Sequence, residues 1–237
     1  MAGYSYALTY DECGKKSVLF GGFAPGQKFD DTWAWEHLGS EGPTARDSPA
    51  IAYNSRQKKI LLFGGHLYDN SFTDDTWEWN GRAWCQIDAA GPCARNHSSM
   101  VYDHARKRAI LFGGRSRIDG ELVQLGDTWE WDGAEWRQVS DSGPGPRAPP
   151  GMVYDRANDN VILHGGWYND TPYLGDSWRW DGSTWVELDV ASPPARARTF
   201  MAFLEGQGTA MLFGGASASG ALQDTWEWDG ERWRQIS

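Results

Sequence analysis

Several side chains that could bind or transform a ligand stand out because they interrupt an otherwise regular pattern in this chain. Their imidazole rings can exchange protons near neutral pH, and their guanidinium groups can pair with a carboxylate or a phosphate. Their aromatic rings offer flat surfaces on which part of a ligand could stack. These residues are Phe23, His66, Tyr68, His97, Arg115, Arg117, His164, Trp167, Tyr168, Tyr173 and Arg198.

The regular pattern is a repeat that occurs five times. Each copy reads Leu-Phe-Gly-Gly, with His164 replacing Phe in the fourth, and each is followed by Asp-Thr-Trp or Asp-Ser-Trp. A fixed period of about 50 residues is typical of an array whose units cannot bury their apolar faces alone. The copies cover residues 19–22, 62–65, 111–114, 163–166 and 212–215.

One repeat illustrates the strands that we expect. Residues 98–102 and 109–112 are small or apolar runs separated by the polar turn 103–107, and residues 128–131 and 135–139 alternate aromatic with polar side chains. Short runs with a period of two, punctuated by Gly-Gly and Asp-Gly, predict four antiparallel strands. Five such units predict an all-β fold, a β-propeller of five blades.

Residues that recur at one repeat position are expected to serve the blade. Fourteen of the fifteen Trp residues recur, and we expect them to pack between adjacent blades. The recurring Asp is expected to cap a turn by accepting backbone N–H bonds, and the recurring Arg to form a buried ion pair or clamp a carbonyl. These charged residues are Asp31, Asp75, Asp127, Asp176, Asp224, Arg46, Arg95, Arg147 and Arg196.

The strand order places most of the non-recurring residues on one face. In a blade of four antiparallel strands, the loops between strands two and three lie on the same side as the connections between blades. We call this side the mouth face, and variable loops on a rigid scaffold are where binding groups usually lie. The opposite face carries residues 103–107 and the Asp-Gly turns, which we interpret as solvated turns.

The repeat resembles the kelch motif. A Gly-Gly doublet closes the second strand, an aromatic strand follows a variable loop, and a further Trp comes about a turn later. Residues 42–46 and 91–95 match the Pro/Arg lead-in of that family, whereas its usual His is replaced by Pro49, Ser98, Pro150 and Thr199. The resemblance covers the whole chain and implies a propeller like the central domain of galactose oxidase. Kelch propellers bind proteins, belong to carbohydrate-active enzymes or act as sugar isomerases, so the function stays open.

The continuous repeat predicts a single kelch-type propeller over residues 1–237, with blades at about 3–42, 43–91, 92–143, 144–193 and 194–237. Blade 1 lacks the equivalent of residues 80–84, and we expect it to lack most of its fourth strand. Residues 36–38 align either with the end of strand three or with residues 85–87 of strand four. Ring closure then requires blade 1 to pack against blade 5, unless the five blades belong to a larger assembly.

Composition narrows the classes of partner. The net charge of −10 argues against binding to nucleic acid or to an anionic membrane, and no apolar stretch is long enough to span a bilayer. We expect no signal peptide and a soluble protein of the cytoplasm, with the mature form of a secreted protein as the alternative. Free thiols are expected at Cys13, Cys85 and Cys93, with a Cys85–Cys93 bridge as the alternative. No metal-binding spacing is present, and we expect neither a metal nor a cofactor.

Three functions remain as hypotheses. The first is a monomeric binding module whose mouth face recognises a small polar or anionic ligand, a glycan or a protein loop, with Arg115, Arg117 and Arg198 pairing to its negative groups. The second is an enzyme in which a mouth histidine acts as general acid or base beside an arginine, and we lean against it. A copper enzyme like galactose oxidase is disfavoured because no matching Tyr, Cys and His constellation is present. The third is an interaction scaffold that uses the rim of blade 1.

Overall fold

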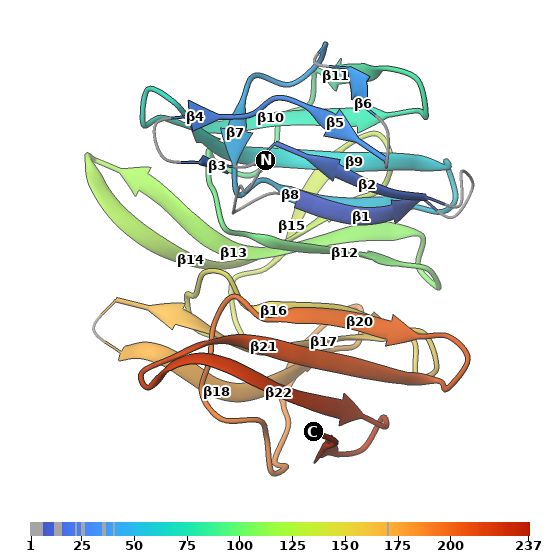
Figure 1. Cartoon of the computed structure of the whole chain (residues 1–237), viewed down its shortest axis with the longest axis vertical. Helices are drawn as coiled ribbons and strands as arrows, with labels where there is room; N and C mark the ends of the chain where they lie inside the picture. Colours follow the sequence, from blue (N-terminus) through green and yellow to red (C-terminus); the bar gives the residue numbers. More distant parts are fainter. Residues whose placement is uncertain are drawn as a thin grey trace.

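The computed structural model describes residues 7–11, 16–21, 23–24, 27–34, 37–39, 41–169 and 171–237. These residues form an all-β fold of five blades arranged as a β-propeller, which confirms the predicted fold class (Figure 1). Within the same residues, no helix is long and apolar enough to cross a membrane.

Each blade is one antiparallel sheet with its strands in sequence order. Blade 1 contains β1 (Ala7–Asp11), β2 (Lys16–Phe20), β5 (Thr32–Trp33) and β6 (His37–Gly39), with a small hairpin of β3 (Phe23–Ala24) and β4 (Gln27–Lys28) between β2 and β5. Blade 2 contains β8 (Ala50–Asn54), β9 (Lys59–Leu67), β10 (Phe72–Trp79) and β11 (Trp84–Ile87), and β7 (Arg46–Asp47) also pairs with β9.

The other three blades are regular. Blade 3 contains β12 (Ser99–Asp103), β13 (Arg108–Ile118), β14 (Glu121–Trp131) and β15 (Trp136–Ser140). Blade 4 contains β16 (Gly151–Asp155), β17 (Asn160–Tyr168), β18 (Thr171–Trp180) and β19 (Trp185–Glu187). Blade 5 contains β20 (Phe200–Leu204), β21 (Thr209–Ser217), β22 (Gly220–Trp228) and β23 (Trp233–Gln235).

The second strand of each blade explains the continuous apolar runs of the sequence. On β9, Leu61 and Phe63 pack toward blade 3, and Ile60 and Leu62 pack toward blade 1. Alternate side chains of a strand point to opposite faces, so a strand held between two neighbouring blades must be apolar on both sides. The described core therefore consists of four clusters, one for each pair of consecutive blades.

One aromatic contact joins each blade to the next. The rings of Phe63 and Trp136 meet edge to face at 5.2 Å, and the indole Nε1 of Trp136 donates a 2.9 Å hydrogen bond to Thr76 Oγ1. The contact recurs for Trp84 on Phe20 and Thr32, and for Trp185 on Phe112 and Thr128. These buried indoles confirm the structural role predicted for the recurring tryptophans at this position, whereas Trp33 is 39% exposed and Trp35 lies outside the described residues.

The recurring Arg and Asp side chains bind each other. Both nitrogens at the end of the Arg46 guanidinium donate to the carboxylate of Asp75, and Nη1 also donates to the carbonyl of Gly64 at 3.0 Å. Trp77 Nε1 donates to the same carboxylate at 2.6 Å. This corrects the turn-capping role that we predicted for Asp75, because the strand pairing shifts between Thr73 and Thr76 and the carboxylate receives the arginine. Blades 3, 4 and 5 repeat the pair as Arg95–Asp127, Arg147–Asp176 and Arg196–Asp224.

Blade 1 is reduced, as its deletion predicted. Its fourth strand, β6, is a three-residue stub, and its third strand, β5, covers only two residues. Trp33 pairs with His37 and Thr32 pairs with Gly39, in the same way as Trp77 pairs with Gln86 in blade 2. His37 and Leu38 therefore correspond to strand four, which decides between the two alignments.

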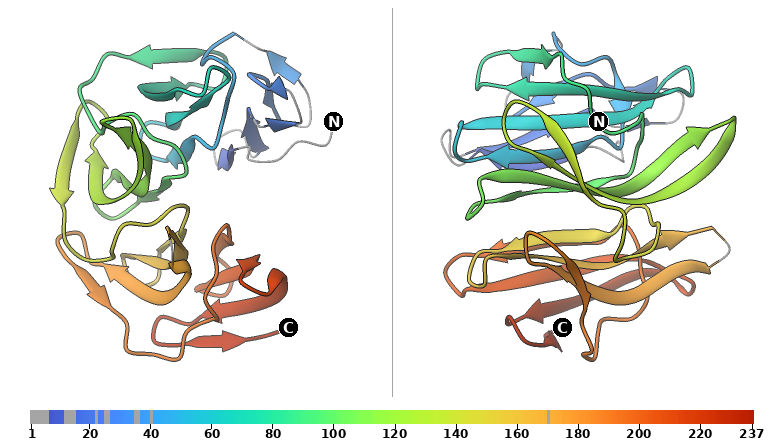
Figure 2. Two further views of the ribbon diagram at one scale, coloured as in Figure 1. Left: turned by 90° about the vertical axis from the view of Figure 1, so that its left-hand side faces the viewer. Right: turned by 180° about the vertical axis from the view of Figure 1, so that it is seen from behind.

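The ring of described blades is open. The innermost strands follow each other in the order β1, β8, β12, β16 and β20, and the first and last blades stand on either side of a gap (Figure 2). Leu8 and Tyr10 on β1 and Phe200 on β20 are exposed, whereas β16 between two neighbours is buried throughout. Packing of blade 1 against blade 5, which ring closure would require, is therefore not formed between the described residues.

Candidate functional site

The mouth face brings together the lead-in to each blade and the residue that follows the Gly-Gly doublet. Asp47 pairs with His66 in blade 2, and Asn96 forms a bridge with Arg115 in blade 3. Ala197 and Ala216 form the same bridge in blade 5. The loops between strands two and three and the connections between blades thus lie side by side, as the antiparallel order predicted.

An unusual backbone conformation recurs two residues after the lead-in arginine. Ser48, His97 and Arg198 have φ values of 52°, 57° and 58°, in the left-handed region that costs energy for residues other than glycine. Backbone bonds hold it in place, because His97 N donates to Ser48 O and Arg198 N donates to Pro149 O. Pro149, at the same position in blade 4, is restricted to negative φ by its ring. Three of the residues with a positive φ therefore lie in the connections on the mouth face.

A lysine, an aspartate and a histidine form one side of the mouth. Lys28, which extends from the β3–β4 hairpin, places Nζ 2.9 Å from Asp47 Oδ2 and donates to the carbonyls of His66 and Leu67. The Nδ1 atom of His66 lies 3.3 Å from the same carboxylate oxygen. Desolvation and the charge of Lys28 lower the pKa of His66, although Asp47 acts in the opposite sense. At neutral pH this side of the mouth therefore carries a Lys–Asp ion pair and a neutral imidazole.

The other side of the mouth collects positive charge. Desolvation and the proximity of Arg198 lower the pKa of Arg115, and Asp47 opposes them. Desolvation, together with the charges of Arg115 and Arg198, lowers the pKa of His97 to about 3. Arg115 Nε is buried with no hydrogen-bond partner among the described residues. A buried donor without an acceptor is unusual, and it marks a place where an acceptor is missing.

We define the mouth cluster by the charged and titratable side chains that interact here. At neutral pH, the two arginines and the lysine carry three positive charges against the single negative charge of Asp47, on a chain with a net charge of −10. The cluster therefore has the electrostatics of an anion site. Its members are Lys28, Asp47, His66, His97, Arg115 and Arg198.

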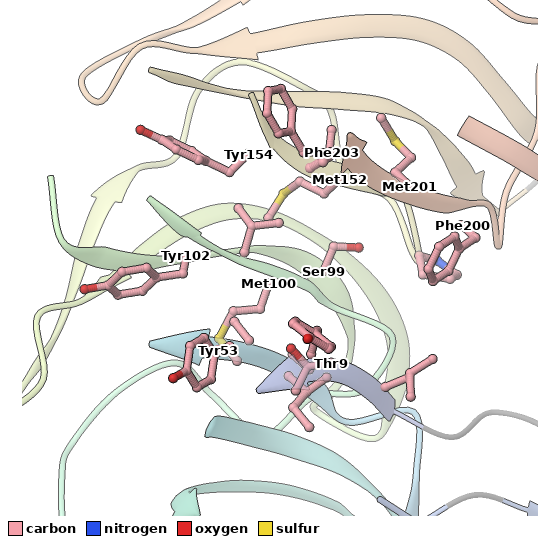
Figure 3. Close-up of a pocket in the computed structure, with 18 of the residues that line it drawn as sticks. Thr9, Tyr53, Ser99, Met100, Tyr102, Met152, Tyr154, Phe200, Met201 and Phe203 are labelled. Carbon is pink, nitrogen blue, oxygen red and sulfur yellow. The ribbon is translucent and has the colours of Figure 1, made fainter. Parts of the chain in front are cut away.

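The axial cavity begins at this face. It has a volume of about 950 Å³, and Arg198 belongs both to its wall and to the mouth cluster. Its middle is apolar, because Met100, Met152 and Met201 lie along three successive inner strands (Figure 3). A ligand with an anionic end and an apolar body would fit a cavity whose wall is positively charged at the mouth and apolar in its middle.

The far end of the cavity is organised differently from the solvated turns that we predicted. Nδ1 of His104 lies 3.0 Å from Ser55 Oγ, and its Nε2 lies 2.7 Å from an Arg156 nitrogen. Arg156 also pairs with Glu205 at 2.7 Å. These contacts connect the turns of blades 2, 3, 4 and 5. The turns bind one another rather than water alone because they converge around the axis at this end of the cavity.

The remaining predicted site residues occupy different places. His164 is fully buried between blades 4 and 5, with Nδ1 2.9 Å from Ser177 Oγ and its ring 5.9 Å from that of Trp233. It fills the Phe position of the interface and does not reach the mouth cluster. Trp167 is half-buried after its glycine doublet, and its carbonyl accepts a hydrogen bond from Ala148 N.

The other five belong to the loops between strands two and three. Tyr68 and Tyr168 are exposed and Tyr173 is half-buried. Arg117 is exposed, and its guanidinium donates to the carbonyl of Gly120 within its own loop. The side chain of Phe23 lies outside the described residues.

Sequence reasoning missed two members of the mouth cluster. Asp47 departs from the repeat, because Asn96, Ala148 and Ala197 stand at its position. This departure could have identified Asp47 from the sequence. Lys28 lies in the loop of the irregular first blade, where no alignment with the other repeats identifies it. Within the described residues, no group of three or more His, Cys, Asp or Glu side chains could hold a metal ion. Cys85 and Cys93 are free thiols rather than a disulfide.

Comparison with known proteins does not assign this chain to a family. No protein-family description matches the chain, and no curated protein matches it at a significant level.

Proposed function

We propose that this protein is a kelch-type propeller that binds a small ligand through a carboxylate or phosphate group held by the mouth cluster. The kelch assignment is supported by the Gly-Gly doublets and by the lead-in arginines, which bind an aspartate in each of blades 2 to 5. The anion assignment is supported by the charges of the mouth cluster.

One observation carries the proposal. Desolvation and the charge of Arg198 lower the pKa of Arg115, and Asp47, the carboxylate of the mouth cluster, is already paired with Lys28. Arg115 is half-buried and Arg198 is exposed, and their like charges repel each other. An anion bound between them would offset this repulsion. The buried Nε of Arg115, which lacks an acceptor among the described residues, would gain one from the same anion.

The histidines support binding rather than acid–base catalysis. A general base works best when its pKa lies near the working pH, and the pKa of His97 is lowered to about 3. At neutral pH its imidazole is neutral, and its N–H can donate a hydrogen bond to an anion. Trp167 and the mouth tyrosines would surround the rest of the ligand with flat apolar surface.

The test is a titration of the protein with inorganic phosphate and with acetate, at constant ionic strength, in which the heat or the amide chemical shifts report binding. Arg115→Ala and Arg198→Ala should each weaken binding by about tenfold or more, because a hydrogen bond to a charged group contributes about 1.5–3 kcal/mol. Arg117→Ala is the matched control, since its guanidinium is exposed and bonded within its own loop.

The control should bind phosphate as the parent does. Thermal melts of the three variants verify that each still folds. Equal affinities for Arg115→Ala and the parent, or equal losses in all three variants, would exclude the mouth cluster as an anion site.

A further inference from the structure

Blade 5 displays one half of an interface that the ring forms four times. Phe213 occupies the position of Phe20, Phe63 and Phe112, yet it is 49% exposed where those three are at most 1% exposed. Phe200 on the same side of the blade is 55% exposed. In each of blades 1 to 3, the equivalent phenylalanine receives a tryptophan of the following blade.

The polar groups of blade 5 that would bind a following blade also lack such a partner among the described residues. In blade 2, Gly64 has a φ of +66°, and a Cβ there would lie 2.5 Å from the carbonyl oxygen of Arg95 in blade 3, so the next lead-in passes directly over this glycine. Gly214 has the same conformation in blade 5, but the nearest described atom is the Leu222 carbonyl of its own blade. Thr225 Oγ1, which elsewhere would accept from an indole, accepts from Ser237 instead.

We infer that blade 5 receives a complete sixth blade of the same repeat type at the position that follows it around the ring. The four existing interfaces define what this blade must carry. It needs an arginine lead-in whose carbonyl passes over Gly214, and a tryptophan at the start of its fourth strand that reaches Phe213 and Thr225. This interface would extend the series of four that joins blade 1 through to blade 5.

Blade 1 does not meet this description, either within the same chain or in a second copy. Trp35 is its one tryptophan between Trp33 and the next lead-in, where blades 2 to 5 have two. The lead-in arginine stands four residues before the first strand in blades 2 to 5, and Gly3 stands at that place before β1. The matching faces of blades 2 to 5 are already covered by their neighbours, so a second copy offers no complete blade.

The chain itself supplies a suitable test blade. Residues 136–140 and 233–237 have nearly the same sequence, and blade 4 follows the first of them with its own phenylalanine-binding tryptophan, Trp185. A chain in which a second copy of residues 141–189 directly follows Ser237 should therefore dock that copy on blade 5. Hydrogen exchange should then slow at least tenfold at the amide of Gly215, and the melting temperature should rise.

The matched control carries Trp185→Ala in the second copy alone, and it should lose most of the protection at Gly215. Unchanged exchange at Gly215 in the six-blade chain would overturn the inference. Sedimentation of the parent chain and of Phe213→Asp gives the other decisive outcome. A monomeric parent supports the inference, because it shows that a second copy does not cover this face of blade 5. A parent dimer that Phe213→Asp dissociates would assign this face to a second copy and overturn the inference.

Discussion

The imidazole Nδ1 of His66 lies 3.3 Å from the carboxylate of Asp47, and this carboxylate is held by Lys28 at 2.9 Å. The only carboxylate of the mouth cluster is thus engaged on one side of the opening. Desolvation and the charge of Arg198 lower the pKa of Arg115, and desolvation and the charges of both arginines lower the pKa of His97. This division leaves the mouth positive on a protein that is negative as a whole.

The first prediction concerns the negative member of the cluster. Asp47→Asn should increase the affinity for phosphate, because it removes the one charge that repels the anion. A charge pair near a protein surface contributes on the order of 1 kcal/mol, which corresponds to about fivefold in the dissociation constant. Titrations of parent and variant at the same ionic strength measure the effect. A variant that binds phosphate more weakly would show that Asp47 helps to hold the anion.

The second prediction concerns the recurring ion pairs. Asp127→Ala should lower the free energy of unfolding by about 3–5 kcal/mol, since it leaves the buried guanidinium of Arg95 without its partner. Arg137→Ala breaks a pair with Glu135 at the exposed edge and should leave stability unchanged within error. Denaturant unfolding of both variants measures the difference. Similar losses in the two variants would contradict a dominant structural role for the buried pairs.

The third prediction concerns pH. Burial, together with the charge of Arg196, lowers the pKa of His164 to about 4 in the folded protein, against about 6.5 in the unfolded chain. The unfolded chain therefore binds the proton first, and the stability that depends on neutral His164 is present above pH 6.5 and is lost as the pH falls toward 4. His164→Phe restores the residue of the other repeats and should remove this loss.

The parent should thus lose about 3 kcal/mol more than His164→Phe between pH 7 and pH 4, an order-of-magnitude figure from the shift in pKa. Urea unfolding at the two pH values gives both numbers. His97 titrates in parent and variant alike, so the comparison isolates His164. Parallel losses in the two proteins would mean that this imidazole does not control the acid sensitivity.

The fourth prediction separates a binding tryptophan from a packing one. Trp131 is buried in the core between blades 2 and 3, and Trp131→Ala should cost about 3–5 kcal/mol of stability. Trp167→Ala should leave the melting temperature nearly unchanged. It should weaken binding of phenyl phosphate, but not of inorganic phosphate, by the ~1–3 kcal/mol typical of ring stacking. Trp167 would be a packing residue if both substitutions destabilise the fold equally.

Much of this architecture could be predicted from the repeat. The strands follow from short apolar runs and alternating aromatics, and the departures from the repeat pointed to His66, His97, Arg115 and Arg198 in the mouth cluster. His164 also departs from the repeat, and it was therefore predicted to lie in the site. A departure from the repeat does not reveal whether a side chain faces the mouth or a neighbouring blade. The contact between His164 and Ser177 shows that the two departures compensate each other inside the interface.

Other features depend on contacts that no single repeat contains. The link from Ser55 through His104 and Arg156 to Glu205 joins four different blades, and each of its members resembles an ordinary turn residue in sequence. Whether the ring closes depends on the angle at which each blade packs on the next, which is set by whole interfaces. The shortened turn of blade 1 could be recognised in the sequence, but the exposed side of blade 5 could not.

The central claim is tested most directly at the side chain of Arg115, whose buried Nε lacks an acceptor among the described residues. The Nε–H resonance of Arg115 can be followed by NMR while phosphate is added, with sodium chloride at matched ionic strength as the control. We predict a saturable downfield shift with phosphate, a much smaller shift with chloride, and loss of saturation in Arg198→Ala. An Arg115 resonance that responds equally to both salts, or not at all, would contradict an anion site at the mouth.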